Sequence, residues 1–118
     1  MIIGIGTDIT STDRFHSNGV AKHKLAAKIL TSVEYNAYIG LPNTLQILYL
    51  AKSWAIKEAT SKAYGTGIRK SMYWTDIQIT KDELGKPIMQ LLNRPEIKTH
   101  VSTSEEGKQI VAMVVLEE

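Results

Sequence analysis

The longest helical signal in this chain is residues 44–65, which read TLQILYLAKSWAIKEATSKAYG. At about 100° per residue, the apolar side chains of this stretch crowd onto one arc of a helix. That arc is formed by Ile47, Leu48, Ala51, Trp54 and Ala55. Gly65 is well suited to end the helix, because glycine adopts the left-handed conformation of a helix C-terminus without steric cost. We therefore expect one long helix over residues 44–64 that packs its apolar arc against the rest of the fold.

Two charged residues lie on the apolar side of this helix. Glu58 falls inside the arc, and Lys62 lies beside it one turn further on. The opposite face, which we expect to meet solvent, contains Ser53, Lys57 and Ser61. A buried carboxylate needs a cation, a proton or strong donors, because burying it without a partner is costly. Two interpretations follow. One is an i,i+4 ion pair with Lys62, which stabilises a helix by about 0.2–0.5 kcal/mol. The other is a metal-binding carboxylate with an ammonium group close by.

Asp8 is the second unexpected carboxylate. It ends residues 2–9, a short, β-branched and nearly all apolar stretch that favours a central strand. Its simplest role is a cap for the turn at residues 9–13. With Glu58 it would instead offer two hard oxygen ligands, which suit Mg²⁺ better than zinc or copper. This second interpretation requires the fold to bring the two carboxylates together.

The other elements predict an α+β domain that spans residues 1–118. A modest amphipathic helix is expected over residues 20–30, and Thr31 with Glu34 has the spacing of a capping box that starts a second helix ending near Gly40. Beyond the long helix, the hydrophobic period changes to two. Strands are expected at residues 73–80, 86–92, 97–104 and 108–116. The order favours N-terminal helices packed on an antiparallel sheet.

Composition excludes several classes of protein. The 118 residues contain no cysteine, which excludes disulfides and thiolate zinc sites, and no apolar run approaches the roughly 20 residues of a membrane span. The amino terminus lacks a basic segment, which indicates a cytoplasmic protein without a signal peptide. A net charge of +2 argues against nucleic-acid binding.

Positive charge is nevertheless concentrated near the amino terminus. Residues 11–30 contain Arg14, Lys22, Lys24 and Lys28 against a single acidic residue, Asp13. Such a patch can steer an acidic partner, or it can be an ordinary solvated helix face.

Taken in order, these motifs resemble the holo-acyl-carrier-protein synthases, which are small trimeric 4′-phosphopantetheinyl transferases. The similar segments are GIGTDI at 4–9, KILTSVE at 28–34, AIKEA at 55–59, SKAYGTGI at 61–68 and GKP at 85–87. The resemblance spans nearly the whole chain, and the segments at 55–68 are its most specific part. It implies the 4′-phosphopantetheinyl transferase fold.

The resemblance also implies a reaction. Members of the family transfer the phosphopantetheine arm of coenzyme A to a serine of apo acyl carrier protein and release adenosine 3′,5′-bisphosphate. By this resemblance Asp8 and Glu58 hold Mg²⁺ against the pyrophosphate, and Lys62 stabilises the charge that develops there. The serine proton would pass to Glu58 or to a metal-bound water. Such a reaction depends mainly on positioning and electrostatic stabilisation.

The family resemblance further implies binding residues and an assembly. Gly65, Thr66, Lys86 and Pro87 would line the nucleotide cleft. Arg14, Lys24 and Lys28 would meet the acidic recognition helix of the carrier protein. The family's sites form between neighbouring subunits, which implies a homotrimer.

Two positions depart from the family pattern. Ser53 stands where the family has arginine, and Glu105 stands where it has a histidine that helps to bind phosphate. Glu105 would repel coenzyme A unless it turns outward or Mg²⁺ offsets it, and Lys52, Arg69 or Lys70 could replace the missing arginine. These departures motivate an alternative hypothesis, a catalytically weakened module that still binds carrier protein.

Overall fold

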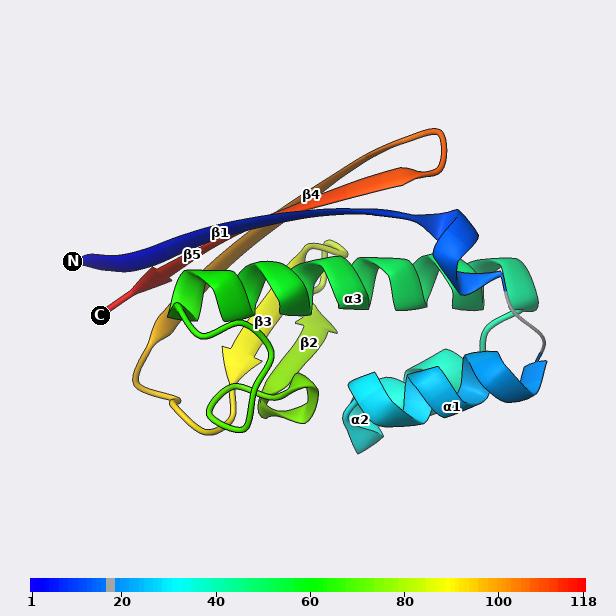
Figure 1. Ribbon diagram of the computed structural model, residues 1–118, viewed down its shortest axis with the longest axis horizontal. Coiled ribbons are helices and arrows are strands. Elements are labelled where there is room, and N and C mark those ends of the chain that lie inside the picture. Colours follow the sequence, from blue (N-terminus) through cyan, green and yellow to red (C-terminus); the bar gives the residue numbers. More distant parts are fainter. Residues whose placement is uncertain (17–18) are drawn as a thin grey trace.

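The structure is a computed structural model that describes residues 1–16 and 19–118, so residues 17–18 of the predicted basic segment lie outside it (Figure 1). Its strands and helices follow the predicted α+β order. They are β1 (Ile2–Ser11), η1 (Thr12–Phe15), α1 (Gly19–Ile29), α2 (Ser32–Ile39), α3 (Asn43–Tyr64), η2 (Trp74–Asp76), β2 (Ile77–Lys81), β3 (Pro87–Leu91), β4 (Lys98–Glu106) and β5 (Gln109–Glu117).

The long helix α3 lies between two layers (Figure 1). An antiparallel sheet with the strand order β1-β5-β4 covers one side of it. Helices α1 and α2 and the separate hairpin β2–β3 pack on the other side. The prediction of helices on an antiparallel sheet is therefore refined, because the strands form two sheets and α3 is the helix that contacts the larger one.

Because both layers cover α3, the helix is buried nearly all round. Ser53, Lys57 and Ser61 are buried, so the prediction that their face meets solvent is wrong. The helical-wheel argument assumes one buried face, and it fails here because α2 and the β2–β3 hairpin cover the second face.

Strand β1 is an edge strand, with β5 in the centre of the sheet. The prediction of a central strand is wrong: the apolar composition of β1 reflects an outer face on which Ile5 and Ile9 remain exposed. The strand also runs on to Ser11, so Asp8 lies within it and pairs with Ala112 of β5.

The backbone of β1 lies unusually close to α3. A Cβ atom built on Gly4 would lie 1.9 Å from the carbonyl oxygen of Ala63, and one on Gly6 would lie 2.0 Å from that of Ala59. No side chain larger than hydrogen fits at either position. The Gly4-Ile5-Gly6 segment therefore serves close packing, and it places Asp8 beside the second half of α3.

Local signals at the element ends agree with the structure. Thr31 caps α2, and the reciprocal bonds of a capping box to Glu34 are both present. Gly65 ends α3 with φ 98°. The strand predicted from residue 73 begins at Ile77, because the preceding residues form η2. No helix in the described part of the chain is long and apolar enough to span a bilayer.

Candidate active site

The packing of β1 on α3 brings three of the predicted site residues together. The Lys62 Nζ atom donates to Asp8 Oδ1 at 3.1 Å and to the Thr7 carbonyl oxygen at 3.1 Å. Among the described residues, Lys62 makes its ion pair with Asp8 and none with Glu58, so the i,i+4 pair expected within the helix is absent. The ammonium group instead ties α3 to β1 across the site.

One carboxylate oxygen of Asp8 is free to bind a ligand. Its side chain is only 13% exposed, and its Oδ2 atom is buried without a hydrogen-bond partner in residues 1–16 and 19–118. It does not cap the following turn, because Ser11 Oγ accepts the Asp13 N–H there at 3.2 Å. A buried acceptor without a donor is costly. Asp8 is therefore suited to bind a cation.

Glu58 is half-buried next to Asp8. Burial raises the pKa of the Glu58 carboxyl, the Asp8 charge adds to that rise, and Lys62 and Arg14 oppose it. Burial is the largest of these effects, so the Glu58 carboxyl holds its proton more readily than an exposed glutamate does. No three acidic or histidine side chains gather into a metal site in residues 1–16 and 19–118. Mg²⁺ commonly takes only one or two protein carboxylates, so this pair fits it.

Arg14 borders the same site. Its guanidinium lies over the ring of Trp54, 5.1 Å from the centroid, and its charge acts on Glu58. Cation–π contact with an indole is favourable, so Trp54 helps to hold Arg14 in place. The sequence assigned Trp54 only to the apolar arc, and no local motif marked its contact with Arg14.

The residues predicted to line a nucleotide cleft fall into two places. At the end of α3, the Ser61 carbonyl oxygen accepts the N–H groups of Gly65, Thr66 and Gly67. Lys86 and Pro87 lie instead where the β2–β3 turn ends. There, Asp82 Oδ1 accepts the N–H of Lys86 at 2.9 Å.

A groove of about 650 Å³ opens between α2, the first half of α3 and the β2–β3 hairpin. Its walls are mostly apolar, with Lys52 and Lys81 among the lining residues. Pro87 lines it together with Gly85, whereas Gly65 and Thr66 are not among the described residues that form its walls. Neither are Asp8, Glu58 and Lys62.

The basic segment is only partly a surface. Arg14, Lys24 and Lys28 are exposed, as a docking patch requires. Lys22 is buried instead and donates to Gln46 Oε1 at 2.7 Å and to Asn43 Oδ1. Lys22 therefore joins α1 to the start of α3 and adds nothing to the patch.

Comparison with known proteins identifies the family. The model of the 4′-phosphopantetheinyl transferase superfamily matches residues 4–115. The chain belongs to this superfamily. Over 117 residues it is 42% identical to a holo-[acyl-carrier-protein] synthase of Bacillus cereus and 38% identical to that of Bacillus subtilis. Each alignment covers 99% of this chain and 97% of the relative. The enzyme family predicted from the motifs is confirmed.

Solved phosphopantetheinyl transferases share the fold. A holo-(acyl-carrier-protein) synthase of Bacillus anthracis, crystallised in complex with CoA (3′,5′-ADP), superimposes with a TM-score of 0.88 at 39% identity. The match covers 98% of this chain and 96% of that one. The predicted 4′-phosphopantetheinyl transferase fold is confirmed.

The two departures from the family pattern lie near the groove. Ser53 is buried in its wall. Glu105 forms an ion pair with Lys52, 3.2 Å apart and half exposed. Lys52 lines the groove together with Ser53, whereas Arg69 and Lys70 are not among the described residues of its walls. The same lysine offsets the charge of Glu105.

Proposed function

We propose that this chain transfers the 4′-phosphopantetheine arm of coenzyme A to a serine of apo acyl carrier protein, with Mg²⁺, and releases adenosine 3′,5′-bisphosphate. The relatives named above support the reaction class. The observation that carries the proposal is the contact of Lys62 with Asp8 at a site where the Asp8 charge also acts on Glu58, with one buried oxygen of Asp8 left without a donor among the described residues.

The chemistry needs few protein groups. Asp8 and Glu58 would hold Mg²⁺, which when bound neutralises pyrophosphate charge. The serine oxygen forms a bond to the phosphorus that bears pantetheine, and the bond from that phosphorus to the bridging oxygen breaks. The electron pair leaves with adenosine 3′,5′-bisphosphate, whose charge Lys62 stabilises. The serine proton passes to Glu58, the half-buried carboxylate on α3 that the Asp8 charge also acts on.

We further propose a homotrimer with active sites between subunits. Gly85 and Pro87 line a groove whose walls lack the carboxylate pair, so a site that uses both draws on two copies. The outer face of the three-stranded sheet offers an apolar contact surface. Ile5, Ile9, Val111 and Met113 are 67%, 60%, 39% and 50% exposed there. Exposed apolar clusters of this kind are typical of protein interfaces.

Arg14, Lys24 and Lys28 are the proposed carrier-protein contacts. Their exposed charges complement an acidic helix, which accelerates association and fixes its register. With this partner the chain would act in fatty acid biosynthesis, in the cytoplasm.

The alternative is a weakened module that binds carrier protein without efficient transfer. Ser53 and Glu105 favour it, because neither supplies the positive charge that a phosphate needs. Calorimetry that shows carrier-protein binding without coenzyme A binding would support this alternative.

The test is a transfer assay. Purified protein is mixed with apo acyl carrier protein, coenzyme A and Mg²⁺, and the carrier is analysed by mass spectrometry. We expect the mass of one phosphopantetheine to be added, and a chelator to abolish the addition. Unmodified carrier in trials with several carrier proteins, including one from the same cell, would refute the proposal. Sedimentation should give about three times the 13.1 kDa chain mass.

A further inference from the structure

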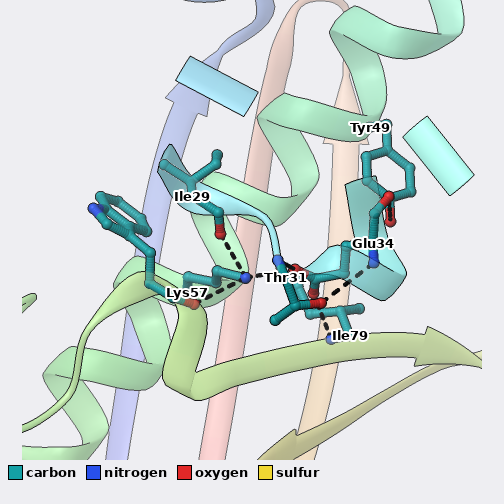
Figure 2. Close-up of polar contacts among 7 residues, drawn as sticks. Ile29, Thr31, Glu34, Tyr49, Lys57 and Ile79 are labelled. Carbon is teal, nitrogen blue, oxygen red and sulfur yellow. Dashed lines mark hydrogen bonds and ion pairs between the residues drawn. The ribbon is translucent and has the colours of Figure 1, made fainter. Parts of the chain in front are cut away.

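A fully buried ion pair lies on the side of α3 away from the three-stranded sheet (Figure 2). The Lys57 Nζ atom is 2.7 Å from Glu34 Oε1, and both side chains are 0% exposed. The sequence placed Lys57 on the solvent-exposed face and gave Glu34 only a capping role. Neither residue belongs to the proposed chemistry, yet Lys57 directly precedes Glu58.

Every polar atom of this pair has a partner. Besides Glu34, the ammonium group of Lys57 donates to the carbonyl oxygens of Ile29 at 2.7 Å and Trp74 at 2.9 Å. Three acceptors match the three N–H bonds of a protonated lysine. Burial lowers the pKa of Lys57, and Glu34 opposes that shift.

Both carboxylate oxygens of Glu34 accept hydrogen bonds. Oε1 accepts the Thr31 N–H at 2.8 Å as well as Lys57, and Oε2 accepts the Ile79 N–H at 2.6 Å (Figure 2). Through these bonds the pair reaches the end of α1, the start of α2, the middle of α3, η2 and strand β2.

Each of the joined elements leads to a different part of the proposed site. Helix α1 ends at Ile29 and bears the carrier-protein contacts Lys24 and Lys28. Strand β2 leads into the hairpin with Lys86 and Pro87. Helix α3 presents Glu58 to Asp8. Stability alone explains the pair poorly, because apolar side chains of similar volume often stabilise a core as well as a buried ion pair does.

We propose that Lys57 and Glu34 are positioning residues, which hold α1 and the β2–β3 hairpin in register with α3, so that each copy presents its carrier contacts, its hairpin and its Glu58 correctly to the sites that it shares with its neighbours. This inference rests on the proposed function. Replacing the pair should therefore weaken the use of both substrates at once, while the carboxylate site on β1 and α3 keeps its own contacts.

The test compares the double variant E34Q/K57M with the wild type and with L116A. Leu116 is fully buried in β5, a strand of the three-stranded sheet on the other side of α3, so L116A controls for lost stability. We expect the double variant to raise KM for coenzyme A and for apo carrier protein about tenfold each, since small misplacements of binding groups have effects of this size or larger. We expect kcat to change less than KM. L116A should leave both KM values near wild type at temperatures well below its melting point.

Calorimetric titration of coenzyme A gives the same comparison without turnover. The single variant E34Q is tested alongside, so that poor folding of one variant does not decide the outcome. An inactive wild type would refute the proposed function itself. The positioning role alone would be overturned if the wild type is active but E34Q and the double variant match L116A. The match would have to hold for both KM values and for coenzyme A affinity.

Discussion

Lys57 and Glu58 are neighbours on α3, yet they lie in opposite environments. Lys57 points into the layer formed by α2 and the β2–β3 hairpin and pairs with Glu34, where every polar atom has a partner. Glu58 is under the influence of the Asp8 charge on β1, where Lys62 pairs with Asp8 and one oxygen of Asp8 has no donor among the described residues. Both regions contain a lysine and a carboxylate from distant parts of the chain.

The difference between these two regions indicates that the Lys57–Glu34 pair has a structural role and that the Asp8–Glu58 site has a chemical one. A buried charge pair that is fully hydrogen-bonded has no capacity for another ligand. A site with an unused buried oxygen on Asp8 and a raised pKa on Glu58 retains that capacity, and groups with shifted pKa values are often found at functional sites. Substitutions in the first region should therefore act on stability and register, and those in the second on the reaction.

The largest effect is expected from E58Q. Loss of the metal-binding and proton-accepting carboxylate should lower the transfer rate by about 100- to 10,000-fold. The fold should survive, because Glu58 makes no ion pair among the described residues. Transfer assays and melting curves would measure both effects, with E118Q, an exposed carboxylate at the end of the chain, as the control. An active E58Q would place the chemistry elsewhere.

K57M should act on stability first. Removing one partner leaves Glu34 buried without its cation, and breaking a buried pair in this way costs about 3–5 kcal/mol. Denaturant unfolding would measure the loss, and K98M, at an exposed lysine of β4, should have little effect. Equal stabilities of K57M and K98M would show that the Lys57–Glu34 pair does not stabilise the fold.

G6A should lower both stability and transfer, because it acts on the packing of β1 against α3. The new Cβ would lie 2.0 Å from the Ala59 carbonyl oxygen, so β1 must move away from α3. Overpacking of this kind costs about 1–3 kcal/mol, and the same movement separates Asp8 from Glu58. We expect reduced stability and reduced transfer together. G40A is the matched control, because its Cβ would meet only ordinary contact at 3.7 Å.

The raised pKa of Glu58 predicts a pH dependence of opposite sign to that of a salt-bridged carboxylate. When the pH lies between the ordinary pKa of a glutamate and the raised pKa of Glu58, this carboxyl is ionised in the unfolded chain but still protonated in the folded chain. The contribution of Glu58 to stability therefore falls as pH rises through this range. Melting temperatures without metal should show E58Q gaining on the wild type from acid to neutral pH. Mg²⁺ should reduce this gain of E58Q at neutral pH, because it stabilises the wild type. If, without Mg²⁺, E58Q instead loses melting temperature relative to the wild type as pH rises, the raised pKa of Glu58 is contradicted.

The smallest effect is expected at the exposed pair Lys52–Glu105. With 37% and 47% of their side chains exposed, the two residues should contribute less than about 1 kcal/mol to stability. K52M would release the charge of Glu105 beside the groove, so KM for coenzyme A should rise, whereas E105Q should lower it. Equal KM values in the two variants would show that this pair does not face the nucleotide.

The sequence predicts those features that depend on neighbours along the chain. The capping box of Thr31 and Glu34, the left-handed Gly65 and the alternating strands are local, and the structure contains all of them. The meeting of Asp8 with Lys62 could be proposed only from the family resemblance, because these residues are 54 positions apart.

Other features depend on packing that no local pattern reports. Lys57 and Lys22 look like surface lysines until α2 and the start of α3 supply their acceptors. Likewise, an apolar β1 suits an edge strand as well as a central one when its outer face stays exposed. Trp54 as a platform for Arg14 depends on η1 folding back onto α3.

The most direct test is a crystal structure grown with Mg²⁺ and coenzyme A. We predict one cation bound by both Asp8 and Glu58 at about 2.1 Å, with the pyrophosphate completing its coordination and Lys62 beside it. A cation bound away from these carboxylates, or two carboxylates that stay apart around bound coenzyme A, would contradict the account.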